Sequence, residues 1–177
     1  MTTGKLGKSH AMFHRKLALS AAAVVALLDQ MVKYLVTHTW DLMNPMVEPI
    51  YILPIFNLTF TKNFGVSMGF LEANSDLSRW LLVAMLSGIS IFVAIWLWRE
   101  KARDDAFALG LILGGALGNI IDRTRLGYVV DYADLHLGET RPFLIFNFAD
   151  AAITFGVLIL LARALLLREK AASTENN

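Results

Sequence analysis

The chain has 177 residues, of which 56% are hydrophobic and 18% are charged, and its formal net charge is +1. Its mean hydropathy is +0.53. A soluble domain of this length carries more charge, so the composition indicates a protein that spans a lipid bilayer. The chain has no basic stripe, which argues against a nucleic-acid partner. The absence of cysteine excludes a thiol nucleophile, a disulfide framework and a cysteine metal site.

Four segments are apolar and long enough to cross a bilayer core, which takes roughly 20 helical residues. The first runs through Asp29, Gln30 and Lys33 with no small-residue cleavage site after it, so we expect it to be retained rather than removed as a signal peptide. The third is short, with room for a further turn at either end. The predicted spans are residues 17–36, 80–98, 106–121 and 143–167.

These spans form a single membrane domain over residues 1–170, followed by a polar tail, residues 171–177, that we expect to be disordered. Nine Lys and Arg residues lie in segments 1–16, 99–105 and 168–177, and five lie in the longer segments 37–79 and 122–142. Because cytoplasmic segments are enriched in Lys and Arg, we expect both termini inside and the two long segments outside.

The first outer segment is too long for a structureless connection. Its residues 56–61 alternate apolar and polar side chains, which is the period of a strand with one buried face. Pro45, Pro49 and Pro54 exclude a helix before this strand. We therefore predict an all-α membrane protein of four transmembrane helices, with a small β-sheet at the outer face of the membrane that the helices span.

Polar residues recur at one level of the predicted bundle. Asp29 lies seven residues below the outer end of the first span, and Asp150 lies seven residues inside the fourth, which is roughly 10 Å in each case. Asn119, Asp122 and Arg123 end the third span at the same face. Carboxylates within a membrane are costly and mark functional or paired groups. The agreement in depth predicts one polar site in the outer half of the bundle.

Local pairing is the simpler interpretation for some of these groups. Asp29 and Lys33 are four residues apart, so they can form an ion pair on one helix face. Asp122, at a helix end, suits a salt bridge or a cap. Asp150 shares a helix face with Asn147 and has no Lys or Arg within a turn, which favours a functional role.

Other patterns are less informative. In the second outer segment, spacing alone leaves Asp131 and Asp134 as possible solvated loop acids. Gly110, Gly114 and Gly118 recur at four-residue spacing, which favours close helix packing rather than chemistry. The four His residues form no pair at metal-ligand spacing and no phosphate-binding glycine loop is present, so we predict neither a metal nor a cofactor.

Five motifs occur in order along the chain: Asp29-Gln30-x-x-Lys33, Asn63-x-Gly65-Val66-Ser67, Gly114-Gly115-Ala116-Leu117-Gly118-Asn119-x-x-Asp122-Arg123, Val129-Val130-Asp131-Tyr132 and Phe146-Asn147-x-Ala149-Asp150. With these motifs the chain resembles the lipoprotein signal peptidases (signal peptidase II), a family of bacterial intramembrane aspartic proteases. The resemblance covers nearly all of the chain except its two tails. It departs from the family at Met68, where Phe is common.

The resemblance implies that Asp131 and Asp150 are the catalytic pair. It further implies a group of residues that line or brace the site: Asn63, Gly65, Asn119, Asp122, Arg123, Asn147, Asp29 and Lys33. The implied substrates are prolipoproteins, cut just before a cysteine that carries a diacylglyceryl group. The implied location is the bacterial inner membrane, in contact with its lipids, with the active site toward the periplasm.

Two other classes of protein stay open from the residues themselves. A small transporter or proton-conducting protein would also place Asp, Asn and Arg at one depth, although the broken helices or repeats typical of transporters are not evident. A membrane assembly factor would use the glycine face to bind another helix. Replacement of Asp131 distinguishes these classes, because a packing factor tolerates the loss of a loop carboxylate.

Overall fold

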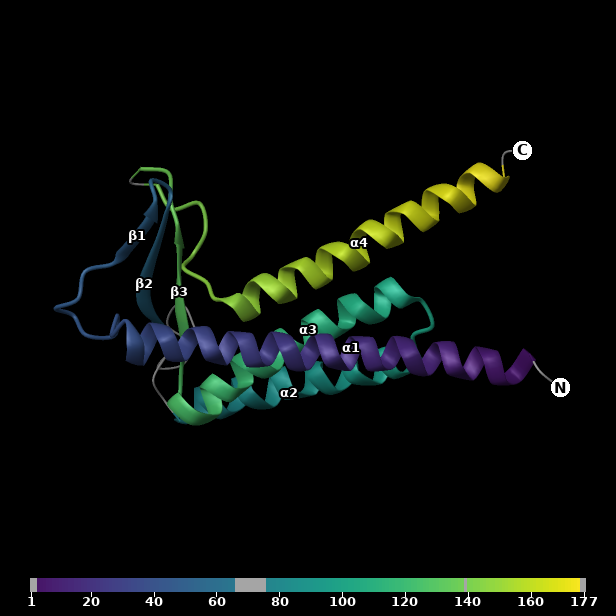
Figure 1. Ribbon diagram of the computed structural model, residues 1–177, viewed down its shortest axis with the longest axis horizontal. Coiled ribbons are helices and arrows are strands. Elements are labelled where there is room, and N and C mark those ends of the chain that lie inside the picture. Colours follow the sequence, from purple (N-terminus) through teal and green to yellow (C-terminus); the bar gives the residue numbers. More distant parts are fainter. Residues whose placement is uncertain (1–2, 66–75, 139, 176–177) are drawn as a thin grey trace.

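Long helices carry a small β-sheet at one end of the molecule (Figure 1). The computed structural model describes residues 3–65, 76–138 and 140–175. Its helices are α1 (Thr3–Tyr34), α2 (Asp76–Arg99), α3 (Arg103–Leu126) and α4 (Phe148–Glu175). Each contains a stretch long and apolar enough to cross a membrane, which confirms the four predicted spans. α3 exceeds the predicted third span at both ends.

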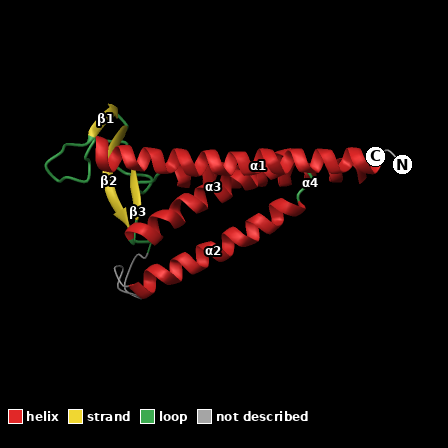
Figure 2. Ribbon diagram, turned by 60° about the horizontal axis from the view of Figure 1, so that its bottom comes forward, coloured by secondary structure: helices red, strands yellow, loops and turns green. Residues whose placement is uncertain are grey.

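The sheet and the two termini lie at opposite ends of the bundle (Figures 1 and 2). The strands run across the ends of the helices rather than along them. Both termini lie at the far end, so a bilayer around the helices would separate the sheet from them. The molecule thus has a sheet end and a terminal end, and these two names are kept below.

α3 occupies the centre of the bundle and contacts each of the other three helices. Its glycines make this possible, as predicted. Gly110 and Gly114 face Ala18 and Ala22 of α1, and a methyl group at Gly114 would lie only 2.5 Å from the Ala22 carbonyl oxygen. Gly115 faces the start of α4 in the same way. Small residues on both helices let the backbones approach closely where lipid provides no hydrophobic drive.

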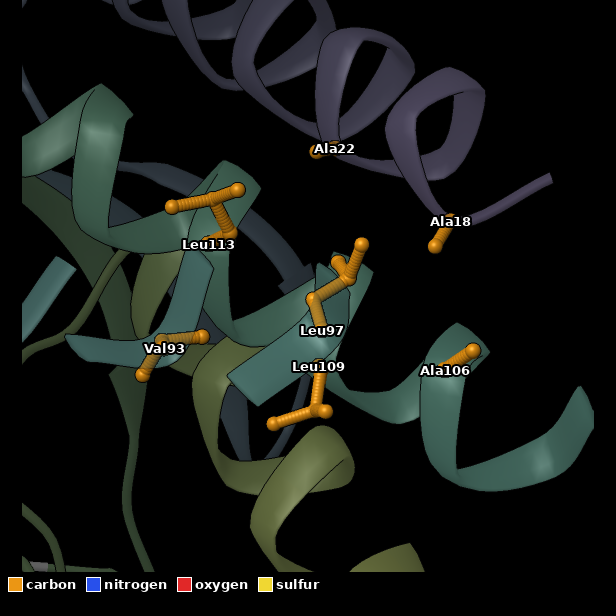
Figure 3. Close-up of a cluster of buried hydrophobic side chains, with 7 residues drawn as sticks. All are labelled: Ala18, Ala22, Val93, Leu97, Ala106, Leu109 and Leu113. Atoms are coloured by element: carbon orange, nitrogen blue, oxygen red, sulfur yellow. The ribbon is translucent and has the colours of Figure 1, made fainter. Parts of the chain in front are cut away.

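A buried apolar cluster joins α1, α2 and α3 toward the terminal end (Figure 3). Small alanines of α1 and α3 meet larger leucines and a valine from α2 and α3 in it. Elsewhere large apolar side chains such as Leu27 and Phe92 point outward from the helices. This is the expected arrangement when the surrounding solvent is hydrocarbon. The cluster consists of Ala18, Ala22, Val93, Leu97, Ala106, Leu109 and Leu113.

The antiparallel sheet has the order β1 (Ile50–Leu53), β2 (Phe56–Asn63) and β3 (Val129–Leu135). β2 confirms the strand predicted over residues 56–61. β3 excludes the possibility, left open by spacing alone, that Asp131 and Asp134 are solvated loop acids, because every residue from Val129 to Asp134 is buried. A strand buried on both faces lacks the alternating pattern by which an exposed strand is recognised.

The register between β2 and β3 determines which residues of β3 lie opposite the two asparagines near the ends of β2. Asn57 lies opposite Asp134, and Asn63 lies opposite Val129. A bulge in β2 falls between Leu58 and Thr61. Beyond Tyr34, α1 continues as a π-helical turn, Leu35–Thr39, whose Val36 packs into the core of the sheet. This contact fixes the sheet to α1.

The predicted start of the fourth span is wrong, and the helix that contains the span extends beyond the predicted end of the span. α4 begins at Phe148 rather than Phe143, because Phe146 pairs through its backbone with Ala133 of β3. Asp150 therefore lies in the first turn of α4 and not seven residues inside the span. At the other end α4 continues to Glu175, so most of the expected disordered tail is helical. Alanine at 171 and 172 favours this continuation.

Candidate active site

The first turn of α4 carries a capping box that holds Asp150. The Asp150 backbone N–H donates to Asn147 Oδ1 at 3.0 Å, and the Asn147 backbone N–H donates to Asp150 Oδ2 at 3.3 Å. Such a reciprocal pair satisfies amides that have no partner within the helix. The spacing of three was noted in the sequence as a shared helix face, whereas the structure shows that it is a helix start.

Side chains from two other elements complete this cap. The Phe148 N–H donates to the Tyr132 hydroxyl of β3 at 3.1 Å, and the Ala149 N–H donates to Asp29 Oδ1 of α1 at 3.0 Å. The beginning of α4 is thus fixed by β3 and α1 together. Because Asp150 lies in this turn, its position depends on three separate parts of the chain.

Asp131 lies on β3, 1% exposed, between two amide donors. Asn63 Nδ2 donates to its Oδ2 at 2.8 Å, and Asn147 Nδ2 donates to its Oδ1 at 2.6 Å. Asn63 is itself held by the Gly65 N–H, which donates to its Oδ1 at 2.8 Å. These contacts bring residues from β2, β3 and the start of α4 to a single carboxylate.

Asp150 belongs to the same hydrogen-bonded group. Asn119 Nδ2 of α3 donates to Asp150 Oδ1 at 2.8 Å, and Asn119 Oδ1 accepts from Asn147 Nδ2 at 3.3 Å. The side chain of Asn147 therefore contacts Asp131, and its backbone contacts Asp150. The structure thus brings together the two aspartates that the motifs single out.

The pKa of Asp131 is raised from 3.8 to about 6. Burial is the largest cause, and the negative charge of Asp150 also raises it, while the hydrogen bonds from Asn63 and Asn147 oppose the shift. The Asp131 carboxyl therefore keeps its proton to a higher pH than an exposed aspartate does.

A buried ion network lies directly beneath the two aspartates. Lys33 Nζ lies 2.8 Å from Asp29 Oδ2 and 2.8 Å from Asp122 Oδ2, and it donates to Asn119 Oδ1 at 3.2 Å. The predicted local pair of Asp29 and Lys33 is confirmed. Asp122 is a salt-bridge partner, as expected, and it also accepts from the Val130 N–H at 3.1 Å. The network joins α1 and α3 to β3.

Arg123 follows this network at the end of α3. Its guanidinium interacts electrostatically with Asp150 and Asp131, and its buried Nε has no hydrogen-bond partner among the described residues. Gly65 lies against it, and a Cβ there would be 3.0 Å from Arg123 Nη2. The φ of +76° at Gly65 also disfavours any other residue. Gly65 thus leaves room for the guanidinium beside the carboxylates.

An open pocket of about 610 Å³ gives access to the site from the sheet end. Asn63, Gly65, Arg123 and Asp131 line its inner wall, while Asp150 is not among the lining residues. Phe143, Leu144 and Ile145 form an apolar side of the same pocket. The pocket therefore combines the Asp131 carboxylate and three cationic side chains, Lys62, Arg123 and Arg141, with a surface suited to hydrocarbon.

Asp134 has a different role from Asp131. It is buried on the same strand, and Arg141 binds it with Nε at 3.0 and 3.2 Å from its two oxygens and Nη2 at 3.2 Å. The exposed Arg141 guanidinium has a raised pKa because of this partner. A carboxylate occupied by an arginine fork is not available for proton transfer. Asp134 is a structural ion-pair partner.

Three further residues of the site were not singled out in the sequence. Gln30 Nε2 donates to Asp122 Oδ1 at 2.9 Å, and its place in the first motif was a usable signal. The hydroxyl of Tyr132 caps α4, as described above. Arg79 Nε of α2 donates to the Arg123 carbonyl at 2.8 Å, and only the fold brings these two residues together. Val66, Ser67 and Met68, which belong to or follow the second motif, lie outside the described residues.

Fold and site together define a multi-pass membrane protein with two aspartates, Asp131 buried and Asp150 partly buried, joined through Asn147 at one end of its bundle. Residues 21–166 match the family model described as signal peptidase (SPase) II. The lipoprotein signal peptidase of Rhizorhabdus wittichii is 54% identical over 167 residues, covering 92% of this chain and 94% of that protein. That of Sphingopyxis alaskensis is 52% identical over 160 residues, covering 90% and 91%.

A solved structure described as a bacterial membrane enzyme is also similar. It has a TM-score of 0.68 and 27% sequence identity, and the match covers 84% of this chain and 92% of the other. The chain belongs to the signal peptidase II family. This membership confirms the resemblance found in the five motifs, and it does not favour the alternative of a transporter or proton-conducting protein.

Proposed function

We propose that this protein is an aspartic endopeptidase that removes the signal peptide from diacylglyceryl-modified prolipoproteins, just before the lipidated cysteine. Its family and the names of its relatives support the reaction and the class of substrate. We assign Asp131 and Asp150 as the catalytic pair. The observation that carries this assignment is that Asn147 donates hydrogen bonds to both carboxylates, with its side chain to one and its backbone to the other.

The reaction needs one ionised and one protonated carboxylate. The ionised carboxylate takes a proton from water while the water oxygen bonds to the scissile carbonyl carbon. The protonated carboxyl gives its proton to the carbonyl oxygen, which yields a tetrahedral diol. On collapse a diol hydroxyl returns its proton to that second carboxylate, the carbon–nitrogen bond breaks, and the leaving nitrogen takes the proton held by the first. The pair is then restored.

The raised pKa of Asp131 supports a site in which a carboxyl can hold a proton for the reaction. Asn63, Asn119 and Asn147 fix the carboxylate oxygens through neutral N–H donors, which restrain the oxygens without titrating. Arg123 reduces the repulsion between the two acids. No metal and no covalent intermediate enters this sequence of steps.

We further propose that the sheet end faces the periplasm and that both termini are cytoplasmic. The dense Lys and Arg near the termini support this orientation, since positive segments stay inside. A signal-peptide helix would then reach the pocket from the lipid, with its scissile bond near the outer interface. Leu144, which is 90% exposed at the apolar side of the pocket, is suited to contact acyl chains of the substrate or of the membrane.

The direct test is cleavage of a synthetic diacylglyceryl-modified precursor by purified protein. Asp131→Asn and Asp150→Asn should each lower the rate by at least about 10³-fold, because either change removes a proton donor or acceptor from the cycle. Both variants should keep a melting temperature close to that of the wild type. The matched control is Asp134→Asn, the same change at a buried aspartate on the same strand, which should stay active.

Substantial cleavage by either of the first two variants would contradict the assignment of the pair. Loss of activity in Asp134→Asn at unchanged stability would show that the effect is not specific to Asp131. Cleavage of a precursor that lacks the lipid, at the rate of the lipidated one, would contradict the proposed substrate class while leaving the aspartic mechanism in place.

A further inference from the structure

The last turn of α3 is held by a side chain from α2. Arg79, in the first turn of α2, donates from Nε to the Arg123 carbonyl oxygen at 2.8 Å and from Nη2 to the Thr124 carbonyl oxygen. The last carbonyls of a helix lack donors within the helix and carry the negative end of its dipole, so a guanidinium suits them. The beginning of α2 lies beside the end of α3 at the sheet end (Figures 1 and 2). Arg79 thus caps α3 from another helix.

Arg79 also contacts the turn that leads from α3 into β3. Gly127 ends α3 with a φ of +84°, and its N–H donates to the Arg123 carbonyl oxygen at 3.2 Å. A Cβ at Gly127 would lie 3.8 Å from Arg79 Cδ, so the stem of the arginine lies over this turn. β3 begins at Val129, directly before the strand reaches Asp131. One side chain of α2 therefore contacts both the helix end and the turn that precede the catalytic aspartate.

A second residue of α2 lies close to the guanidinium of Arg123. Leu82 follows Arg79 by three residues, so the two side chains share one face of α2. A Cβ at Gly65 would lie 3.1 Å from Leu82 Cδ1 and 3.0 Å from Arg123 Nη2. The start of α2 thus contacts the carbonyl of Arg123 directly and bounds the space beside its guanidinium.

A stabilising ion pair is a simpler role for a cation at this place, and it does not fit Arg79. The carboxylate of Asp76 is 4.0 Å from Arg79 Nη1 and its side chain is 91% exposed, so that pair is weak. The closer contacts of Arg79 go to the backbone that carries Arg123. Arg123 is 8% exposed, and its Nε has no hydrogen-bond partner within the described part of the chain. The position of its guanidinium therefore depends on that backbone.

We propose that Arg79 is a positioning residue for cleavage and that it acts through Arg123. It fixes the end of α3 so that the Arg123 guanidinium stays close to Asp131 and Asp150, with which it interacts electrostatically. The proposal rests on the proposed function, because its effect is exerted on the assigned catalytic pair. Arg79 does not line the pocket at Asp131, so we assign it no direct contact with the substrate.

The first experiment removes the two donors and keeps the apolar stem. Arg79→Met should lower kcat about tenfold with KM unchanged, because a displaced charge beside the reacting groups slows the reaction without weakening binding. Arg125→Met is the matched control, since Arg125 is an exposed arginine in the last turn of α3, and it should keep full kcat. Arg79→Lys retains a cation but not the planar fork, so it should lose a few fold in kcat. It also serves as the test if Arg79→Met fails to fold.

A double-mutant cycle separates positioning from general stability. Arg123→Gln keeps the carbonyl that Arg79 binds and removes the guanidinium. In this background Arg79→Met should lower the melting temperature as much as it does in the wild type, yet leave the residual kcat unchanged, because the effect on kcat passes through the missing guanidinium. An equal fall in kcat in both backgrounds would overturn the proposal and would show that Arg79 only stabilises the fold.

NMR spectra of isotope-labelled arginine side chains give a measurement that does not depend on cleavage. The Nε–H signal of Arg123, assigned by its loss in Arg123→Gln, should shift in Arg79→Met and stay in place in Arg125→Met. An unmoved signal in Arg79→Met would overturn the proposal, as would wild-type kcat in both Arg79 variants. Failure of the proposed function is distinguishable, because the wild type would then cleave no precursor while the NMR signal still reports the link from Arg79 to Arg123.

Discussion

The contact between α1 and α3 has two halves, and glycines of α3 serve a different purpose in each. Toward the terminal end, Gly110 and Gly114 admit the backbone of Ala18 and Ala22. One turn closer to the sheet, Gly118 admits the carboxylate of Asp29 instead, and a methyl group there would overlap its Oδ2. A stripe of small residues that serves packing in the membrane interior therefore also makes room for the polar site.

The two ends of the bundle also differ in how they hold charge. At the sheet end Lys33, 4% exposed, lies between two buried carboxylates. At the terminal end Arg163 binds Asp104 and Asp105, and all three side chains are partly exposed. Buried charges depend on one another because water cannot replace a lost partner, whereas exposed pairs are readily solvated. The same type of contact should thus have very different energetic weight at the two ends.

Replacement of the central lysine should give the largest effect on stability. Lys33→Met leaves Asp29 and Asp122 buried without their cation, and we expect a loss of about 3–5 kcal/mol in the free energy of unfolding. Arg163→Met, at the exposed end, should have a much smaller effect, because water can solvate the carboxylates that it leaves. Denaturant unfolding in detergent measures both. Equal losses for the two variants would show that the ends of the bundle do not differ in this respect.

Added methyl groups on the glycine stripe should separate packing from catalysis. Gly114→Ala and Gly118→Ala should each cost about 1–3 kcal/mol, because both overfill a close helix contact. Only Gly118→Ala should also lower kcat in the folded fraction, since it displaces Asp29, the residue that caps α4 next to Asp150. Melting temperatures and single-turnover cleavage rates check this. A comparable fall in kcat for Gly114→Ala would remove the distinction.

Most of the fold could be predicted from patterns in the sequence. The four spans were predictable from their length and apolar composition, and β2 was predictable from its alternation of apolar and polar residues. β3 was not, because burial on both faces removes its alternation and mixes Asp131 and Asp134 with apolar neighbours. The start of α4 was missed for a related reason. Phe146 is apolar enough to look like part of the span, yet its backbone belongs to the sheet.

The sequence allowed us to predict which residues belong to the candidate site. It did not allow us to predict which hydrogen bonds and ion pairs these residues form. Motif order pointed to the aspartates, but spacing alone could not separate Asp131 from Asp134. The difference is an arginine fork supplied by Arg141, which lies in a connection with no regular pattern. Similarly, the count of residues from a helix end misjudged Asp150, since the capping box at Asn147 decides where the helix begins.

The titration of Asp131 tests the coupling at the sheet end. Its folded-state pKa of about 6 exceeds the usual pKa of 3.8 for an aspartate, so its contribution to stability is largest below about pH 4 and is lost as the pH rises through about 6. Asp131→Asn should flatten this dependence of melting temperature on pH. If Asp131 holds the catalytic proton, kcat/KM should fall as the pH rises above about 6.

Neighbouring variants should move this pKa in opposite directions. Asp150→Asn removes a like charge and should lower it, as seen by infrared spectroscopy of the protonated carboxyl. Asn63→Ala removes a hydrogen bond that favours the carboxylate, so it should raise the pKa and shift the alkaline limb of kcat/KM to higher pH. Movement of both variants in the same direction would contradict the proposed coupling.

The smallest expected effect concerns a single hydroxyl that joins the sheet to the bundle. Tyr132→Phe keeps the ring in the core of the sheet but leaves the Phe148 N–H at the start of α4 without its acceptor. The loss should be about 1 kcal/mol in the free energy of unfolding, as for one neutral hydrogen bond. Because Phe148 precedes Asp150 by two residues, kcat should fall by a few fold with KM unchanged. Tyr128→Phe is the matched control: its ring lies near the same core, and within the described part of the chain its hydroxyl has Met43 Sδ as its one hydrogen-bond partner, so this change should alter neither quantity. Equal behaviour of the two variants would mean that the cap does not position the catalytic turn.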